Sequence, residues 1–350
     1  MAASTTAAAE ARNFSMNRSS FSPRSALRAL VLALGLMTPA LATAAAPPAA
    51  SSEAPDLRGG SCSVEGLMDQ IRRGLGSKSE AYKRYLRTLL RESAVLLPLN
   101  ELQAAFEREY DPAMAEHLAA ALVARTERGL EPEAMQAVTQ RALTDKDPSI
   151  RAATVRALRR TGALERTGDM YERLVRDPSP EVRKEAATNL VEDNLEVYGG
   201  HEAQATDAAV SAAAASTDPK VTAQVLGNIM TGEASPESTH KLQGLLGSDS
   251  AEVRAAAVKA LGGVPASGMA SARESLLGMY RDEKDPAVRK SILESIARLG
   301  FSSAVPELQR LRSVDPSLAP EIDAWTQALN MNLQEWSLIL REKQRLQQAR

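Results

Sequence analysis

Apolar residues recur along most of this chain at the spacing of an amphipathic helix. One copy of the pattern begins at Val288 and continues with Ile292, Leu293 and Ile296, which lie four, five and eight positions later. At about 100° per residue, these positions share one face of a helix. The copy that begins at Val253 is built in the same way. Each copy therefore predicts a helix with one buried side.

The pattern occurs seven times, at intervals of 32 to 39 residues. The copies begin at Met114, Ile150, Val182, Val221, Val253, Val288 and Ile322. Further helix-favouring segments fill most of the intervals, at 132–143, 164–175, 236–247, 269–280 and 303–313. Self-similarity at such a period is typical of stacked repeats, and two antiparallel helices per repeat form an α-solenoid. We therefore predict an all-α fold, a solenoid of helical hairpin repeats.

An aspartate stands where each predicted helix begins. Asp-Pro pairs start at positions 111, 147, 177, 218, 285 and 315, and Asp249 holds the equivalent place without a proline. Aspartate accepts hydrogen bonds from the free amides at a helix N-cap, and proline fits the first turn because its missing N–H needs no partner there. These pairs predict the helix starts.

An arginine follows the first aliphatic residue in four copies, as Arg151, Arg183, Arg254 and Arg289. It falls on the packed side of the helical wheel, although the helix macrodipole disfavours a cation in the first turn. Such an arginine needs an acidic partner. We expect this partner to be a capping aspartate of the same or the neighbouring repeat, in a ladder that fixes the register between repeats. The predicted acids are Asp147, Asp177, Asp249 and Asp285.

Charge and composition exclude some functions without choosing one. The chain has 350 residues, of which 25% are charged and 3% aromatic, and its formal net charge is −2. It contains no run of five like charges, so an extended phosphate-binding surface is not indicated. We expect no nucleic-acid partner.

Residues 1–44 have the organisation of a secretory signal peptide. Arginines including Arg24 and Arg28 precede the apolar run 29–37, and Ala42-Thr43-Ala44 offers a cleavage site. Nine strongly apolar residues are too few to span a bilayer comfortably. We expect cleavage, a periplasmic or secreted location and no integral membrane span. The alternatives are an uncleaved N-terminal anchor and a true start at Met16.

The rest of the chain divides by composition. Residues 45–62 are rich in Ala, Pro and Ser and are predicted to be a flexible linker. The single cysteine, Cys62, can form no disulfide within the chain. Residues 63–110 are predicted to be a helical N-terminal cap, 111–330 the repeat array and 331–350 a C-terminal capping helix. Alternatively, the last helix docks on a partner helix through its apolar residues.

Four segments carry a resemblance to a known family, namely DPSIRAATVRAL, SPEVRKEAATNL, DSAEVRAAAVKAL and DPAVRKSILESI. They are similar to HEAT repeats, in particular to the short HEAT-like repeats of bilin lyases, and the chain resembles an exported bacterial member. The resemblance covers about residues 111–330 and is strongest over 145–300. It implies an α-solenoid that serves as a scaffold, because few members of the family are enzymes. Tetratricopeptide arrays have a similar period, but their Trp-Leu-Gly-Tyr pattern is missing here.

Motifs for catalysis or metal binding are nearly absent from the sequence. It has no Walker loop, no dinucleotide-binding glycine motif, no His-Glu-x-x-His and no cysteine pair. The three histidines, His117, His201 and His240, lie far apart. HEAT-like iron hydroxylases carry several His-Glu dipeptides, whereas this chain has one, at 201–202. We expect no catalytic residue, no metal and no other cofactor.

These observations favour an exported, non-catalytic scaffold that binds a protein or envelope partner along its solenoid surface. The alternative is an enzyme or accessory lyase that binds a small ligand in the solenoid groove. The candidate partner surface comprises Lys184, Lys259, Lys290, Tyr198 and His201. The last two belong to the insertion 194–217, which is expected to be a longer loop because the repeat interval there reaches 39 residues. The partner's identity and the oligomeric state do not follow from the sequence.

Overall fold

The computed structural model describes residues 64–348, except positions 77–78, 95, 130 and 163. The predicted signal peptide, the linker and Cys62 lie outside the described residues. Every regular element in the described part is a helix, which confirms the all-α prediction. None of these helices is long and apolar enough to cross a bilayer.

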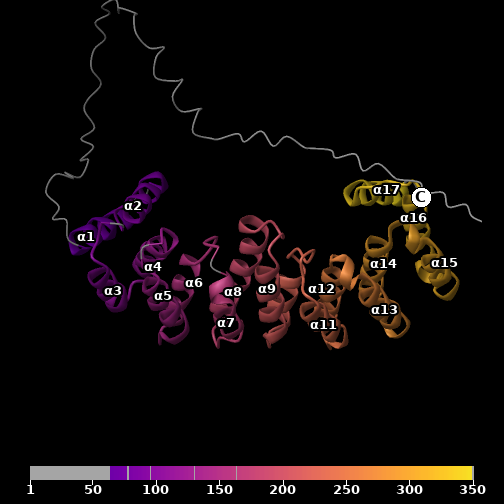
Figure 1. Ribbon diagram of the computed structural model, residues 1–350, viewed down its shortest axis with the longest axis horizontal. Helices are drawn as coiled ribbons and strands as arrows, with labels where there is room; N and C mark the ends of the chain where they lie inside the picture. Colours follow the sequence, from indigo (N-terminus) through magenta and orange to yellow (C-terminus); the bar gives the residue numbers. More distant parts are fainter. Residues whose placement is uncertain (1–63, 77–78, 95, 130, 163, 349–350) are drawn as a thin grey trace, which may run out of the picture. The chain divides into compact units, whose positions relative to one another are not determined.

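The helices of the repeats fall into two sets (Figure 1). Seven begin at the repeated turns and are called the turn row: α4 (Pro112–Glu127), α6 (Pro148–Ala157), α8 (Pro180–Glu192), α10 (Pro219–Leu226), α12 (Ala251–Leu261), α14 (Pro286–Gly300) and α16 (Ala319–Leu329). Those that precede them are called the opposite row: α3 (Leu99–Arg108), α5 (Glu133–Thr144), α7 (Leu164–Leu174), α9 (Ala203–Ala215), α11 (Pro236–Gly244), α13 (Ala266–Asp282) and α15 (Val305–Val314). Short 3₁₀ turns lie at helix ends: η3 (Leu245–Gly247), η4 (Phe301–Ala304) and η5 (Pro316–Leu318).

Each turn-row helix forms a hairpin with the helix that precedes it. Only residues 145–147 join α5 to α6, and α6 packs far more closely against α5 than against α7. The sequence interpretation opened each repeat at the Asp-Pro turn, whereas in the structure this turn lies inside the hairpin. Consecutive turn-row helices also pack on each other, so neighbouring hairpins stack in chain order (Figure 1).

The turn-row helices bury the face that the sequence predicted. On α14, Ile292, Leu293 and Ile296 are fully buried and Val288 is 1% exposed. Burial of one such side chain contributes about 1.5–3 kcal/mol. The apolar period is therefore the main stabilising feature of each hairpin and confirms the sequence pattern.

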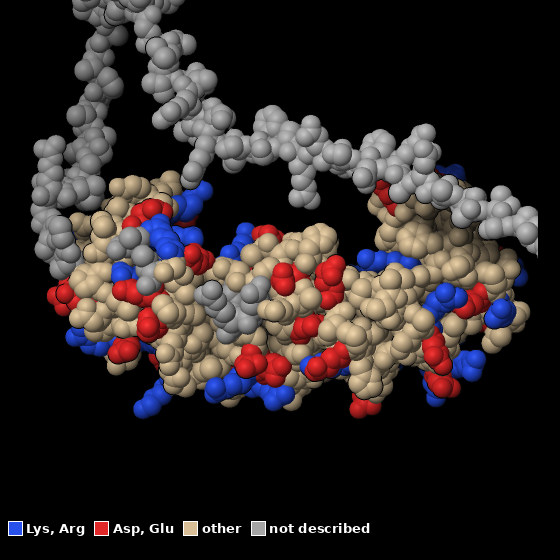
Figure 2. Space-filling model, viewed as in Figure 1, with Lys and Arg blue, Asp and Glu red and all other residues tan. Residues whose placement is uncertain are grey.

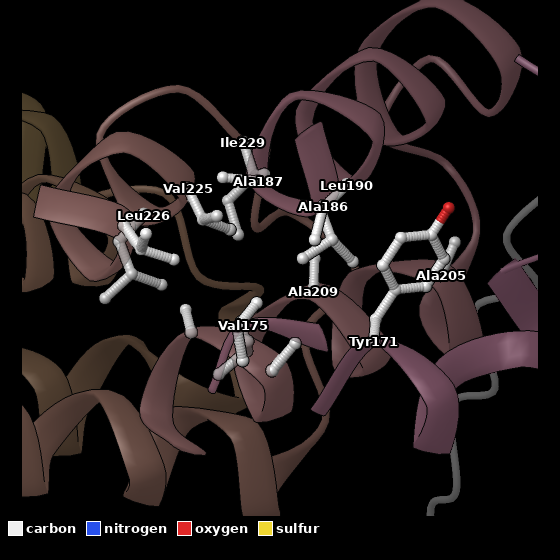
Figure 3. Packing of buried hydrophobic residues seen from close by; sticks show 14 of the residues in the cluster. Tyr171, Val175, Ala186, Ala187, Leu190, Ala205, Ala209, Val225, Leu226 and Ile229 are labelled. Atoms are coloured by element: carbon white, nitrogen blue, oxygen red, sulfur yellow. The ribbon is translucent and has the colours of Figure 1, made fainter. Parts of the chain in front are cut away.

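Small side chains let neighbouring helices approach closely. Ala186 of α8 and Ala205 and Ala209 of α9 lie near Tyr171 of α7 and near Val175, which directly follows α7 (Figure 3). All five are buried. Large and small side chains thus pack against each other in the interior. The alanine-rich composition is explained by this close packing of helices.

The 39-residue interval is mostly helical, which corrects the expectation of a longer loop. α8 runs on into a π-helical turn, η2 (Asp193–Val197), and α9 then supplies the opposite-row helix. The Asn194 side chain accepts a hydrogen bond from the Met230 amide at 2.8 Å and donates one to the Met230 carbonyl at 3.3 Å. Gly200, with φ of 72°, approaches Met230 so closely that a Cβ would lie 2.4 Å from the Met230 Cβ. The insertion is therefore fastened to the residues that follow α10.

Helices also cover both ends of the described array. α1 (Val64–Leu75) and α2 (Glu80–Ser93) pack on each other and against α3 and α4. At the other end, α17 (Trp336–Gln348) packs on α16, where the Trp336 and Trp325 rings stack with centroids 5.5 Å apart. Ile339 of α17 is 1% exposed. In the described chain, α17 thus covers apolar surface of α16.

Candidate functional site

Aspartates at the repeated turns cap their own helices. The carboxylates of Asp111, Asp147, Asp218 and Asp285 each accept a hydrogen bond from a backbone amide in the first turn that follows, at 2.8–3.0 Å. These bonds satisfy amides that a helix leaves free at its start. The capping prediction is confirmed for these four turns.

Two of the predicted caps are displaced by one or two residues. Ser179 rather than Asp177 is the N-cap residue of α8, because Pro180 occupies the first helical turn. Ser250 rather than Asp249 caps α12, and its hydroxyl accepts from the Val253 amide at 3.4 Å.

Each ladder arginine reaches the turn of the next hairpin. Arg151 donates through Nε and Nη2 to the two carboxylate oxygens of Asp177, at 2.8 and 2.7 Å. Arg183 donates through the same two nitrogens to one oxygen of Asp218, at 3.0 and 2.9 Å. The Arg151 and Asp177 side chains are 11% and 8% exposed. These pairs are thus largely shielded from solvent.

The two later rungs follow the same direction along the chain. Arg254 forms a fork on Glu283, with Nε and Nη2 at 2.7 and 3.0 Å from its oxygens. Arg289 donates through Nη1 to Asp315 at 2.7 Å. The ladder acids are therefore Asp177, Asp218, Glu283 and Asp315.

Three of the predicted ladder acids hold other places. Asp147 and Asp285 cap their own helices, and Asp249 meets Arg254 through its backbone carbonyl at 3.1 Å. The physical reason lies in the turn, where the acid two residues before the cap faces the neighbouring hairpin. Glu283 holds this position and also accepts from the Asp285 amide at 2.8 Å.

Asp177 repeats that geometry, because it accepts from the Ser179 amide at 2.8 Å while it binds Arg151. One carboxylate thus braces its own turn and joins two hairpins. Sequence reasoning missed Glu283, Asp218 and Asp315 as ladder acids. For Glu283 the available signal was an acidic residue two positions before the cap, as in Glu283-Lys-Asp285-Pro. Asp218 and Asp315 instead are the N-cap residues of α10 and η5 and bind the ladder arginine from that position.

The ladder arginines also bind carbonyls within their own hairpin. Nη1 of Arg151 donates to the Asp145 carbonyl at 2.8 Å, and Asp145 is the C-cap residue of α5. Arg183 and Arg254 make the equivalent bond at 2.9 Å. The C-terminal end of a helix attracts cations. The end of the preceding helix therefore offsets the unfavourable position of the arginine in the first turn of its own helix.

The pKa values of three ladder groups, Glu283, Asp218 and Arg151, shift in the directions that favour their charged forms. The hydrogen bond from Arg254 lowers the pKa of Glu283. Burial alone would raise the pKa of Asp218, but hydrogen bonds from Arg183 and the Lys220 amide hold it below its usual value. The bond to Asp177 raises the pKa of Arg151 further. These groups stay charged throughout the neutral range.

The ladder is interrupted once. Thr222 stands in place of an arginine, and its hydroxyl donates to the Ala213 carbonyl of α9 at 3.0 Å. Ser248 holds the acid's place in the next turn, where its hydroxyl accepts from the Ser250 amide at 3.3 Å. Between α10 and α12 the arginine and the acid are thus replaced together.

The predicted partner-binding residues lie on several elements. Lys184 on α8 and Lys290 on α14 are exposed and hold the same repeat position. Lys259 on α12 and His201 are also exposed, and the Lys259 Nζ donates to the Gly227 carbonyl. By contrast, the Tyr198 hydroxyl donates to the Gly162 carbonyl at 2.6 Å, and its ring packs against the core. Tyr198 thus holds the insertion against the connection between α6 and α7.

Two buried titratable groups lie apart from the ladder. His117 on α4 is 6% exposed, and burial lowers its pKa. Asp193 in η2 is 1% exposed, and burial raises its pKa to about 7. One Asp193 oxygen accepts from the Arg160 amide at 2.7 Å, and the other has no hydrogen-bond partner among the described residues. Within the same part of the chain, no group of three His, Cys, Asp or Glu side chains is placed to hold a metal ion.

Charged side chains of both signs are mixed over the face shown in Figure 2. Two surface cavities stand out among the described residues. One, of about 630 Å³, lies between α1 and α3, where Arg72 already bonds to Glu109 at 2.7 Å. The other, of about 430 Å³, lies between α13 and α15 beside the last rungs of the ladder.

Comparison with known proteins supports the repeat interpretation. The family model for HEAT repeats matches residues 206–297 and 238–330. No curated protein matches the sequence. Human deoxyhypusine hydroxylase in complex with glycerol is similar over 81% of this chain and 95% of its own, at 16% identity and a TM-score of 0.25. An engineered protein is similar over 80% of this chain and 98% of its own, at 17% identity and a TM-score of 0.26.

These two structural similarities are too weak to support an argument about function. The fold and the match to the family model agree with each other. The described chain is an all-α solenoid of helical hairpins, and its residues 206–330 match HEAT repeats.

Proposed function

We propose that this protein is an exported, non-catalytic scaffold that binds a protein or envelope partner along its stacked hairpins. The observation that supports this most is the distribution of the arginines. Four ladder arginines are spread over four hairpins, and each is bonded to a separate acid. A catalytic site would instead bring such groups together around one substrate. Repeat arrays bind through extended surfaces that successive repeats supply.

The partner surface of this proposal is the exposed side of the turn row. Lys184 and Lys290 lie on helices of that row, at the same position in their repeats. Exposed cations at a constant repeat position can meet acidic groups spaced along a partner. Tyr198 is left out of the surface because its hydroxyl is bonded to Gly162.

Cross-linking in cells followed by mass spectrometry tests this function. We expect one reproducible partner whose yield falls strongly in Lys184→Glu/Lys290→Glu. Lys146→Glu/Lys284→Glu is the matched control, because it makes the same charge change at two exposed turn residues. Equal yields from both variants would place the surface elsewhere. If no partner is found and a small molecule co-purifies, the ligand-binding enzyme or accessory lyase becomes the better proposal.

The proposed location rests on the sequence of residues 1–44. Cell fractionation should find the protein outside the cytoplasm and shortened at its N-terminus to about residue 45. A full-length protein in the cytoplasm would contradict export and leave the scaffold proposal standing.

A further inference from the structure

The cavity between α13 and α15 has the dimensions and the lining of a binding site. Its volume of about 430 Å³ falls within the range of small-ligand and side-chain pockets. Its walls come from α13, the turn after it, the start of α14 and the end of α15. Its lining includes Leu277, Arg281, Arg289, Arg310, Leu311 and Val314.

The carboxylates of this cavity are already bonded to arginines. Glu283 is bonded to Arg254 of the ladder at 2.7 and 3.0 Å. Glu307 is held by Arg273 in a second fork, at 2.9 and 2.6 Å. Neither Arg254 nor Arg273 lines the cavity. The negative charge of these two acids is thus balanced from outside it.

The third carboxylate, Asp315, accepts hydrogen bonds from three side chains at once. It accepts from Arg289 at 2.7 Å, from the Tyr280 hydroxyl at 2.9 Å and from the Ser317 hydroxyl at 2.5 Å. These bonds leave no acid in the lining without a partner.

The arginines of the cavity, in contrast, keep free donors. Arg281 and Arg310 are exposed, and their guanidinium groups form no hydrogen bond or ion pair with the described residues. Arg289 differs from the other ladder arginines, because its buried Nε has no partner in the described part of the chain. A guanidinium carries five N–H donors in a fork that matches a carboxylate. The lining therefore has an excess of donors suited to an anion.

An apolar wall lies beside these donors. Leu277 and Leu311 are partly buried, and Val314 is 77% exposed. An exposed valine next to a cavity is surface that a ligand can remove from water, at about 25 cal/mol per Å². The ligand should thus be acidic and apolar at neighbouring positions.

We propose that this cavity binds an acidic peptide segment of a partner protein. A leucine-sized side chain packs on Leu277, Leu311 and Val314, and flanking carboxylates pair with Arg281 and Arg310. Arg clusters recognise acidic motifs in this way, and a peptide supplies both chemistries within a few residues. This inference rests on the scaffold function and names a contact of that scaffold.

Fluorescence anisotropy of a labelled peptide tests the proposal. The probe is fluorescein-Gly-Ser-Asp-Leu-Glu-Glu-Ser amide, titrated with the purified protein. We expect saturable binding that weakens about tenfold or more in Arg281→Gln/Arg310→Gln. Arg84→Gln/Arg87→Gln, two exposed arginines on α2 with the same change of charge, should stay within about twofold. Circular dichroism confirms that the variants are folded.

Two altered probes separate the parts of the site. Replacing the leucine by serine should weaken binding about fivefold or more, and replacing the three acids by amides should abolish it. Equal weakening by the two arginine variants, or no saturable binding, would overturn the proposal. Binding of free glutamate as tightly as the peptide would also overturn it, in favour of a small-carboxylate site.

The cross-linking experiment distinguishes this inference from the function on which it rests. If Arg281→Gln/Arg310→Gln reduces the yield of the cross-linked partner, both stand. If the partner is captured at an unchanged yield, the scaffold stands and the assignment of this cavity fails. If the probe binds at the cavity but no partner is captured in cells, the scaffold function fails.

Discussion

At the scale of single residues, the position of a ladder arginine is explained by the helix end that its side chain faces. Arg151 lies in the first turn of α6 and donates to the carbonyl of Asp145, the C-cap residue of α5. The sequence predicted that such an arginine faces inward and has an acidic partner. Of the four acids that it named, only Asp177 binds a ladder arginine through its carboxylate, because the choice depends on how one turn faces the next hairpin. Asp177 and Glu283 face it, whereas Asp147 and Asp285 turn towards their own helices.

Removal of one ladder arginine should destabilise the fold measurably. Arg151→Ala leaves the buried Asp177 carboxylate without its fork, and we expect a loss of roughly 2 kcal/mol in the free energy of unfolding. Arg312→Ala is the control, because Arg312 pairs with Asp323 but is 51% exposed. That change should lower stability by less than about 1 kcal/mol. Urea denaturation measures both, and equal losses would argue against a special role for the ladder.

The raised pKa of Asp193 predicts a pH-dependent contribution to stability. Its folded value of about 7 lies above its usual value, so its contribution is full in acid and is lost as the pH rises through 7. The groups that act on it are Glu192, Arg159, Arg160 and Tyr171. Asp193→Asn should therefore stabilise the protein by roughly 2–4 kcal/mol at pH 8, and by much less at pH 5.

Urea titrations of the wild type and Asp193→Asn at both pH values provide the measurement. The difference between the two proteins is the relevant quantity, since His117 changes the stability of both in the opposite direction. Burial lowers the pKa of His117, so its contribution is lost as the pH falls. A difference that does not change with pH would show that Asp193 does not titrate in this range.

At the scale of the helix, the hydrophobic period was the most informative signal in the sequence. Val288, Ile292 and Leu293 are buried as the wheel required, because burial of apolar area dominates helix packing. Where the signal was weak, the expectation was wrong. Residues 203–215 read as a loop because they are mostly alanine, which shows little periodic contrast. This segment forms a helix that packs against α7 and η2, and Asn194 of η2 donates to the Thr206 hydroxyl at 3.3 Å.

The observed caps allow a sharp comparison between two aspartates. Asp285 accepts from the Ala287 and Val288 amides at 2.8 and 3.3 Å. Asp285→Ala should therefore cost about 1 kcal/mol of stability. Asp249→Ala should have little effect, since Ser250 caps that helix. If thermal unfolding shows equal losses, the assignment of the cap to Ser250 is wrong.

The last helix offers a test of how the array is closed. Trp336 stacks on Trp325, which is fully buried. Trp336→Ala should remove this contact, lower stability by roughly 2–3 kcal/mol and raise the fluorescence response of Trp325 to quenchers. Ser337 on the same helix is exposed, and Ser337→Ala serves as the control. A Trp336→Ala protein of unchanged stability would indicate that α17 does not cover α16 in solution.

At the scale of the whole molecule, the hairpins act as a series of units joined by ladder pairs and shared apolar contacts. In such arrays stability is the sum of repeat and interface contributions, and each repeat contacts its neighbours. The solenoid could be predicted from sequence because the same short pattern is repeated seven times. The binding character of the cavity between α13 and α15 could not, since it depends on Glu283 and Glu307 being bonded to arginines from outside the cavity.

The loss of one ladder pair should therefore loosen the two hairpins that it joins and leave distant hairpins unchanged. Hydrogen exchange with mass spectrometry on Arg183→Ala tests this most directly, because Arg183 joins α8 to the turn before α10. Exchange should accelerate in α8 and α10 and in the turn between α9 and α10, while α14 and α16 keep their wild-type rates. Uniform acceleration over all helices, or none in α10, would contradict a ladder that joins neighbouring hairpins.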